Sequence, residues 1–267
     1  MIRERAPAKV NLLLHVGPRR ADGLHELCSL FASIDLADEV TVERADADEV
    51  VCAGVEGPNL ALTAVERFRA EAAPDLPPLR VTIEKRIPVA AGLGGGSADA
   101  AAVLRAANRL AGELLGAGGL RALGARVGAD VPSQVEPRHA LVTGAGEEVE
   151  PVELPPMALV LVPDEHGLST AEVYAQADAL GTTRTQLERD RVRALAARPL
   201  DELAAALEND LEGAAISLRP ELCARQGELR EAGALTARVT GSGPTVFGVF
   251  RPGEEPEIDG AIRTELV

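Results

Sequence analysis

The sequence predicts an α+β protein with two domains, and three observations support this class. Segments with apolar residues at alternate positions are mixed with segments of helical periodicity, without the regular alternation of a doubly wound fold. The 267 residues are 46% hydrophobic and 26% charged, which is typical of globular proteins with one large or two modest cores. A stretch rich in proline and acid at 150–157, EPVELPPM, predicts the boundary between domains of residues 1–152 and 153–267.

The first domain contains three predicted strands and three predicted helices. Alternating apolar residues predict strands at residues 7–16, 37–45 and 78–87, the last of which Pro88 ends. Helical spacing predicts helices at 59–73, at 103–111, and within 118–128, where Gly128 stops the third. Asn59 is a suitable N-cap for the first helix. Asp130 then lies in a loop.

In the second domain, a buried strand is predicted at residues 157–163. A helix should follow at 169–180, with Ser169 or Thr170 as its cap, and further helices at 185–197 and 200–217. Residues 237–250, ARVTGSGPTVFGVF, predict a strand, a glycine turn and a second strand.

Charge and composition exclude several classes of function. The net charge is −15 and no basic stripe is present, which argues against nucleic-acid binding. No apolar run approaches the roughly 20 residues that cross a bilayer, and the N-terminus lacks the pattern of a signal peptide. The three cysteines lie far apart, so we expect reduced thiols, a cytoplasmic location and no membrane partner.

A glycine-rich run, IPVAAGLGGGSADAAAVLRAANRL at residues 87–110, precedes a helix and indicates an anion-binding site. It does not fit a P-loop, because Gly96 stands before Ser97 where that motif needs lysine. It also misses the third position of the dinucleotide fingerprint. Converging amides and a helix N-terminus would still bind phosphate. The alternative is a tight strand-to-helix connection in which Ser97 is only an N-cap.

Lysine is rare in this chain. Of the 27 basic residues only Lys9 and Lys85 are lysines, so the other 25 are arginines. These two positions are candidates for a compact ammonium group, although chance survival explains them equally well.

Four segments together carry a resemblance to a known family. The stretch PVAAGLGGGSADAA resembles the phosphate-binding loop of the GHMP kinases. The segments APAKVNLLLHVGPRRADGLHEL, GADVP and TGSGPTVFGVF are similar, in order and spacing, to blocks of the 4-diphosphocytidyl-2-C-methyl-D-erythritol kinases, and ENDLE at 208–212 looks like a further family segment. The resemblance implies a GHMP kinase fold, with an N-terminal nucleotide-binding domain and a C-terminal ferredoxin-like domain.

The resemblance also implies an activity and its cofactors. It implies an ATP- and Mg²⁺-dependent kinase of non-mevalonate isoprenoid biosynthesis that phosphorylates the tertiary hydroxyl of a cytidine diphosphate-linked polyol. We also expect a monomer or weak homodimer. Lys9 and Asp130 would form the catalytic pair, with Asp130 accepting the hydroxyl proton and Lys9 steadying charge near the transferring group. Without the resemblance, Asp130 is a plausible helix cap or turn residue.

The remaining site residues divide between nucleotide and acceptor. The residues expected around ATP are Lys85, Pro88, Val89, Ala90, Ala91, Gly92, Leu93, Gly94, Gly95, Gly96, Ser97 and Ala98, with Ser97 also near Mg²⁺. A solvated strand-end lysine is the simpler interpretation of Lys85. The residues expected around the acceptor are Asn11, His25, Thr170, Tyr174, Gly241, Ser242 and Gly243. Residues 241–243 alone would suggest a hairpin turn, and Tyr174 could instead pack in the core.

The sequence departs from the family pattern near the acceptor. Leu24 stands where the family has an aromatic residue before the histidine, and Ser133 and Gln134 follow GADVP in place of aromatic residues. Three alternatives therefore stay open beside the leading one. They are a GHMP kinase for another small alcohol, an inactive nucleotide-binding relative and, least supported, a dehydrogenase.

Overall fold

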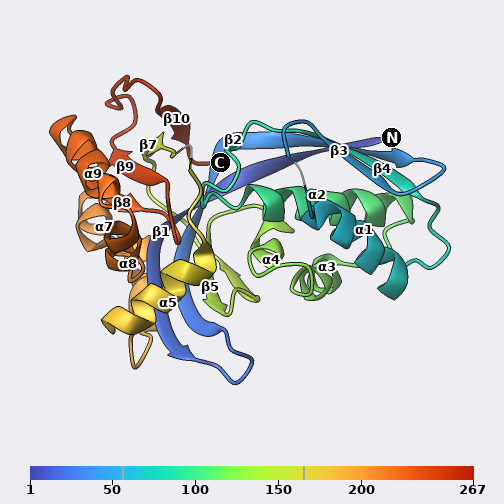
Figure 1. Ribbon diagram of the computed structural model, residues 1–267, viewed down its shortest axis with the longest axis horizontal. Coiled ribbons are helices and arrows are strands. Elements are labelled where there is room, and N and C mark those ends of the chain that lie inside the picture. The colour runs from blue at the N-terminus through green and yellow to red at the C-terminus, as the bar shows by residue number, and fades with distance from the viewer. Residues whose placement is uncertain (56, 165) are drawn as a thin grey trace.

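The α+β prediction is confirmed by the structure, a computed structural model that describes residues 1–55, 57–164 and 166–267. Two sheets lie towards opposite ends of the molecule's long axis, and helices pack against each (Figure 1). The strands are β1 Ile2–Arg19, β2 His25–Arg44, β3 Glu49–Cys52, β4 Leu79–Glu84, β5 Ala140–Gly144, β6 Glu148–Pro151, β7 Ala158–Val162, β8 Thr236–Val239, β9 Val246–Phe250 and β10 Ile262–Glu265. The helices are α1 Leu60–Glu71, α2 Gly95–Leu110, α3 Ala117–Gly124, α4 Val131–Gln134, α5 Thr170–Leu180, α6 Arg189–Ala196, α7 Leu200–Ala206, α8 Glu212–Leu218 and α9 Glu221–Glu231.

The first sheet is built on a long antiparallel pair, β1 and β2, whose register runs from Ile2–Val42 to Arg19–His25. The other edge of β2 pairs with β5 near its start and with β4 near its end, and β3 and β6 complete the sheet. Helices α1, α2 and α3 cover one face of this sheet and enclose an apolar core that includes Phe68, Val81 and Leu104.

The second sheet has the strand order β10-β7-β9-β8 and is antiparallel throughout. In chain order this is 4-1-3-2, the arrangement of a ferredoxin-like sheet, although residues 251–261 join β9 to β10 without a helix. The connection between the sheets, residues 152–157, forms no strand or helix. A shared core joins the two halves, because Leu12 and Leu30 of the first sheet pack with Leu159 and Phe247 of the second.

Several predicted elements differ from the structure. The predicted helix at 200–217 is wrong, because residues 207–211 separate α7 from α8. The helix expected to end at Gly128 ends at Gly124 and continues only as a turn. By contrast, the predicted caps Asn59 and Ser169 accept hydrogen bonds from the amides of Ala61 and Glu172.

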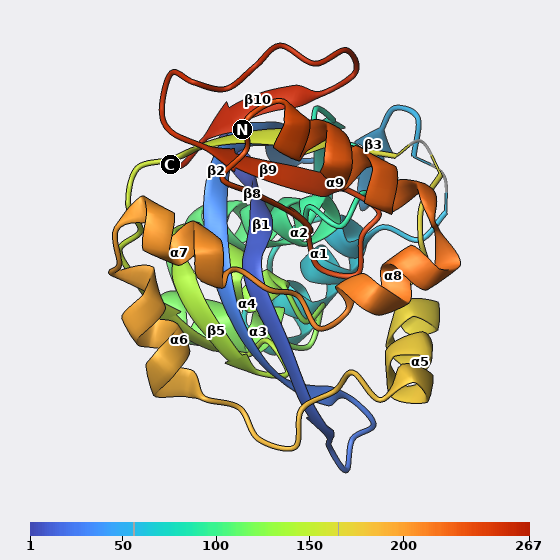
Figure 2. The ribbon, with the colours of Figure 1, turned by 90° about the vertical axis from the view of Figure 1, so that its left-hand side faces the viewer.

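In the part of the chain that the structure describes, loops rather than a further strand cover the outer edge of β1. Its amides and carbonyls bind, in order along the strand, the loop at Leu93, the turn at Thr240, the segment at 208–210 and the loop at Arg184. Four distant parts of the chain therefore meet along one strand edge. One of them, the connection from α7 to α8, passes beside β1 in Figure 2.

Candidate active site

The glycine-rich loop leads directly into α2, which begins at Gly95. Gly92 and Gly94 have φ angles of +76° and +71°, a backbone region that favours glycine, and Gly94 is the N-cap of the helix. The amide of Lys9 donates to the carbonyl oxygen of Leu93 at 3.0 Å and fastens the loop to β1. The loop thus places the free amides of the first turn of α2 at a fixed point beside the sheet.

A cavity of about 330 Å³ lies against this loop. It is lined by Lys85, Pro88 to Ser97, the segment around Asn59 and Leu60, and Asp99. Among the residues expected around the nucleotide, Ala98 is placed differently, because its side chain is buried within α2 and does not line the cavity. Ser97 is not the N-cap. It lies in the first turn of α2 and faces both this cavity and the next one.

Lys85 is a largely buried lysine held between two carboxylates, so the solvated interpretation is wrong. Its side chain is 15% exposed, and its Nζ lies 2.5 Å from Oδ2 of Asp38 and 2.9 Å from Oδ2 of Asp99. Burial opposes its charge, but Asp99 and Asp38 outweigh burial and raise the pKa of Lys85. The ammonium lies directly beneath the loop, 3.2 Å from the point where a Cβ on Gly95 would stand.

The two carboxylates beside Lys85 were not among the predicted site residues. Asp38 also accepts hydrogen bonds from the amides of Arg86 and Ile87, and so fixes the strand-to-loop connection. Burial raises the pKa of Asp99 to about 7, against the lowering effect of Lys85. An aspartate inside an alanine-rich helix was a visible signal for Asp99, whereas nothing in the sequence linked Asp38 to the loop.

Lys9 and Asp130 lie together, with Nζ of Lys9 3.3 Å from Oδ2 of Asp130. Lys9 is only 5% exposed, and its Nζ also donates to Oδ1 of Asn11 at 2.6 Å and to the carbonyl of Gly92 at 3.4 Å. An ammonium has three donors, and these three oxygens match them. The Nζ also lies 4.9 Å from the ring centre of Phe31.

The carboxylate of Asp130 does not act as the helix cap that its position in the sequence suggested. Asp130 occupies the N-cap position of α4, but its side chain makes no capping hydrogen bond. The hydroxyl of Ser133 instead donates to the backbone carbonyl of Asp130. The partly exposed carboxylate therefore faces Lys9 and a second cavity.

This second cavity has a volume of about 740 Å³ and shares Leu60, Gly92, Gly94 and Ser97 with the first. Its lining brings together Lys9, Asn11, His25, Asp130, Thr170, Tyr174, Gly241 and Ser242. Gly243 lies outside this lining, and its carbonyl instead approaches Gly92. The glycine loop thus separates a smaller cavity from a larger one, and the Lys9–Asp130 pair lines the larger one beside the shared loop residues.

The far part of the larger cavity carries two neighbouring rings, tilted by 31° to one another. The rings of His25 and Tyr174 have centres 5.3 Å apart, and Nε2 of His25 is hydrogen-bonded to Oδ1 of Asp178 at 3.0 Å. Burial, with a smaller effect of Asp130, raises the pKa of Tyr174. Tyr174 both packs against the core and lines the cavity, so it can be a core residue and an acceptor-site residue at once. Asp178 was missed, although it lies one helical turn beyond Tyr174.

The two departures from the family pattern lie in different surroundings. Leu24 is 52% exposed and lines the larger cavity. Ser133 and Gln134 are buried in α4 and do not line it. Only Leu24 therefore alters the surface that a ligand would meet.

Neither a metal cluster nor a membrane helix occurs in the part of the chain that the structure describes. Across residues 1–55, 57–164 and 166–267, no three histidine, cysteine or acidic side chains are grouped to hold a metal ion. The helices of these same ranges are too short or too polar to cross a bilayer.

Comparison with known proteins gives a consistent result. The GHMP kinases N terminal domain matches residues 59–136, and the GHMP kinases C terminal domain matches residues 192–265. A 4-diphosphocytidyl-2-C-methyl-D-erythritol kinase of Kineococcus radiotolerans is 44% identical over 91% of this chain and 79% of its own length. One from Rhizobium johnstonii is 42% identical over 93% of this chain and 84% of its own length.

Solved structures agree with the sequence relatives. A crystal structure of 4-(cytidine 5'-diphospho)-2C-methyl-D-erythritol kinase superposes with a TM-score of 0.78, at 34% identity and 99% coverage of both chains. A homoserine kinase from Cytophaga hutchinsonii shares the fold, with a TM-score of 0.70 at 19% identity over 95% of this chain and 86% of its own. The chain belongs to the GHMP kinase family and, within it, to the 4-diphosphocytidyl-2-C-methyl-D-erythritol kinases.

Proposed function

We propose that this kinase transfers the γ-phosphoryl group of ATP to the tertiary hydroxyl of 4-diphosphocytidyl-2-C-methyl-D-erythritol, a step of non-mevalonate isoprenoid biosynthesis. One observation carries the proposal. The ion pair of Lys9 and Asp130 lines the larger cavity beside the glycine loop, and that loop borders both cavities. A phosphoryl donor in one cavity and an alcohol in the other would meet at this pair.

The smaller cavity is the proposed nucleotide site. ATP is the phosphoryl donor of the kinase family to which the chain belongs. Its phosphates would lie against the amides of the loop and the N-terminus of α2, whose partial positive charge favours anions. Lys85 would support the loop with its ammonium group, which lies 3.2 Å from the point where a Cβ on Gly95 would stand, and Asp38 and Asp99 hold it there.

The residues present fit a magnesium ion bound mainly by the nucleotide. Mg²⁺ in kinases takes few protein ligands and several phosphate and water oxygens, so a site needs only one or two oxygen donors from the chain. Ser97 supplies a hydroxyl at the junction of the two cavities, and Asp130 supplies a nearby carboxylate in the larger one. When bound, the ion would neutralise charge on the β- and γ-phosphates.

The larger cavity is the proposed acceptor site. His25 and Tyr174 would bind the cytosine end, with Asp178 orienting the imidazole. Thr170 and Ser242, whose hydroxyl oxygens are 3.0 Å apart, would contact the diphosphate. Asn11 would hydrogen-bond the polyol beside Lys9.

The proposed reaction moves one proton and one phosphoryl group. Asp130 accepts the proton of the acceptor hydroxyl while the hydroxyl oxygen attacks the γ-phosphorus. The bond between the γ-phosphorus and the bridging oxygen breaks, and ADP leaves with that oxygen. Lys9 offsets the negative charge that spreads over the transferring group.

Further properties stay predictions from the sequence. We propose a domain boundary after residue 152, within the proline-rich connection that lies between the two sheets. A cytoplasmic location and a monomeric or weakly dimeric state are also proposed.

An ADP-release assay with ATP and Mg²⁺ tests the proposed function. The assay compares the cytidylated substrate with a panel of small alcohols such as homoserine and mevalonate. We expect turnover only with the cytidylated substrate. Turnover with another alcohol would instead favour a changed specificity, for which the exposed Leu24 beside His25 is the structural motive. Nucleotide binding without turnover on any acceptor would refute the proposal.

A further inference from the structure

The segment 208–212, ENDLE, leads from the break after α7 into the first residue of α8. Each of its polar side chains makes a hydrogen bond. It lies outside both cavity linings, so the proposed chemistry assigns it no part. Its contacts reach β1 on one side and the turn after β8 on the other.

The segment is paired to β1 through backbone hydrogen bonds. The amide of Leu14 donates to the carbonyl of Glu208, and the amide of Asp210 donates to the carbonyl of Leu14, both at 2.9 Å. The amide of Val16 also donates to Oδ2 of Asp210 at 2.9 Å. These bonds extend the sheet edge by a short parallel bridge, on the strand that carries Lys9.

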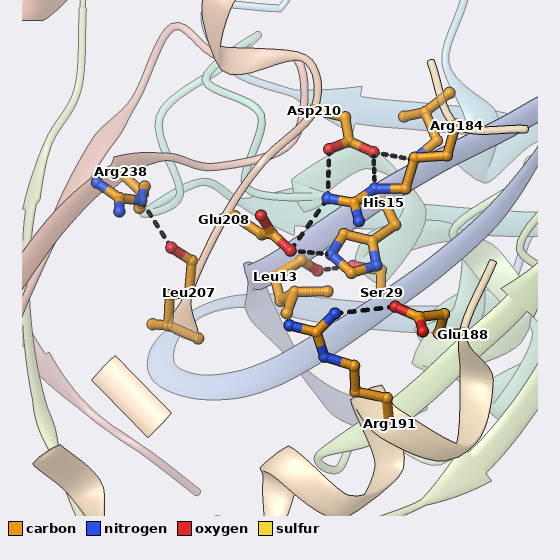
Figure 3. A network of polar contacts seen from close by, with 11 residues as sticks. Leu13, His15, Ser29, Arg184, Glu188, Arg191, Leu207, Glu208, Asp210 and Arg238 are labelled. Atoms are coloured by element: carbon orange, nitrogen blue, oxygen red, sulfur yellow. Dashed lines mark hydrogen bonds and ion pairs between the residues drawn. The ribbon is translucent and has the colours of Figure 1, made fainter. Parts of the chain in front are cut away.

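Charged side chains reinforce this bridge, as Figure 3 shows. Arg184 binds both carboxylate oxygens of Asp210, at 2.7 and 2.9 Å, and lies 3.0 Å from Oε1 of Glu208. Nε2 of the buried His15 is 2.7 Å from the same Glu208 oxygen. Burial opposes ionisation of Glu208, but His15 and Arg184 outweigh it and lower its pKa. The bridge is therefore held by charge-assisted contacts among side chains of three segments, β1, the loop at Arg184 and residues 208–210.

Asn209 points the other way, towards the glycine turn. Its Nδ2 donates to the carbonyls of Val239 and Gly241, each at 2.8 Å, and its Oδ1 accepts from the amide of Leu211 at 2.9 Å. Both amide protons and the carbonyl oxygen of this buried side chain are thus used. An asparagine is well suited to this position, because it offers two donors and an acceptor in one short, rigid group.

The turn that Asn209 holds is in contact with the proposed reacting centre. A Cβ on Gly241 would stand 3.1 Å from Oδ1 of Asn11 and 3.8 Å from Nζ of Lys9. The neighbouring Ser242 is hydrogen-bonded to Thr170 in the acceptor cavity. A displacement of the turn would therefore reach both the lysine and the acceptor groups.

We infer that Asn209 is a positioning residue, which acts through the carbonyl of Gly241 to hold the glycine turn against Asn11, Lys9 and the acceptor cavity. The inference rests on the proposed kinase function. It predicts that loss of the Nδ2 donors lowers kcat and raises the acceptor KM. The KM for ATP should change less, because residues 240–243 do not line the nucleotide cavity.

Two substitutions of Asn209 and one matched control test the inference. Asn209→Asp keeps the size and the acceptor for Leu211 but turns a carboxylate oxygen towards two carbonyls. Asn209→Ser keeps an oxygen that can bond the nearby backbone, and it is less disruptive than Asn209→Asp because it adds no charge. Its shorter side chain no longer reaches the carbonyl of Gly241. The control is Asn108→Asp, since Asn108 is equally buried, donates to the carbonyl of Leu115 at 2.8 Å and accepts from its amide at 2.9 Å, away from both cavities.

The measurements are kcat and both KM values in the ADP-release assay, together with Tm for each protein. We expect both Asn209 variants to lose about 10-fold or more in kcat/KM for the acceptor, since small misplacements of reacting groups cost this much or more. Asn108→Asp should lower Tm by a similar amount and keep wild-type constants. Wild-type constants in Asn209→Ser, or equal kinetic losses in Asn108→Asp, would overturn the inference. An inactive wild-type protein would refute the proposed function instead.

Discussion

Replacing Gly92 with alanine tests the contact between the glycine loop and the turn at 240–243. Gly92 has a φ of +76°, and a Cβ there would stand 2.7 Å from the carbonyl oxygen of Gly243 and 3.1 Å from that of Thr240. Ordinary contact begins at 3.4 Å, so the turn would have to move by 3.4 − 2.7 = 0.7 Å. Both oxygens belong to backbone, which cannot swing aside as a flexible side chain can.

Two separate costs are expected from this substitution. The left-handed backbone conformation costs an alanine about 1–2 kcal/mol, or roughly 2–8 °C in Tm for a chain of this size. The displaced turn carries Gly241 away from Asn11 and Lys9. Because a shift of about 1 Å at reacting groups costs on the order of 100-fold, we expect kcat/KM to fall about 10- to 100-fold.

Gly112→Ala separates the two costs. Gly112 has a φ of +90°, but no atom lies within 4 Å of its Cβ position. It should show only the loss of Tm that comes from the left-handed conformation, a smaller loss than in Gly92→Ala, and should retain wild-type kinetics in the ADP-release assay. The reasoning is refuted if the two variants have the same kcat/KM.

Four further predictions concern other parts of the molecule. Lys9→Arg should lower kcat by about 100-fold with little change in the KM for ATP, because a planar guanidinium cannot match the three oxygens around Nζ; an arginine variant with wild-type kcat contradicts this. Leu24→Tyr should lower the KM for the cytidylated acceptor roughly fivefold, about 1 kcal/mol of stacking, with the KM for ATP as the control. Ala90→Gly should raise Tm and stabilise the fold by about 0.5–1 kcal/mol, because Ala90 has a φ of +55°; calorimetry showing a lower Tm would count against it. Burial, with a smaller effect of Arg184, lowers the pKa of His15 below 6.5. The unfolded chain therefore binds a proton at His15 more tightly than the folded protein does, and stability is lost as the pH falls below 6.5. His15→Gln should make the fall of Tm with acidification shallower, and an unchanged slope would show that His15 does not carry it.

The sequence predicted those elements whose own pattern decides their structure. Strand β7 and helix α1 follow directly from a buried apolar run and from an amphipathic helix capped by Asn59. Helix α9 was missed because Gln226 interrupts its buried face of Leu222 and Leu229. The break in the predicted helix at 200–217 was also invisible, because it depends on bonds from Asn209 and Asp210 to distant strands.

Within the site, the proximity of Lys9 and Asp130 was available only through the family resemblance, since they lie 121 positions apart and no local pattern joins them. The state of Lys85 was misjudged for the same reason. Its partner Asp38 lies 47 residues earlier, and two carboxylates from separate elements are needed to hold an ammonium in so buried a position. Long-range pairing of charges is the part of this site that local reasoning does not reach.

The edge of β1 that gathers four loops has a consequence for how this chain can vary. The backbones of Lys9, Asn11, Leu14 and Val16 bond the glycine loop, the turn at Thr240, residues 208–210 and the loop at Arg184, with Asp210 shared by Leu14 and Val16. Side chains also alternate between the faces of a strand. Deleting or inserting one residue between positions 9 and 16 would shift the register of every later position on the strand relative to its partner. Length changes in descendants of this protein should therefore gather at the hairpin tip, residues 20–24, and spare the strand.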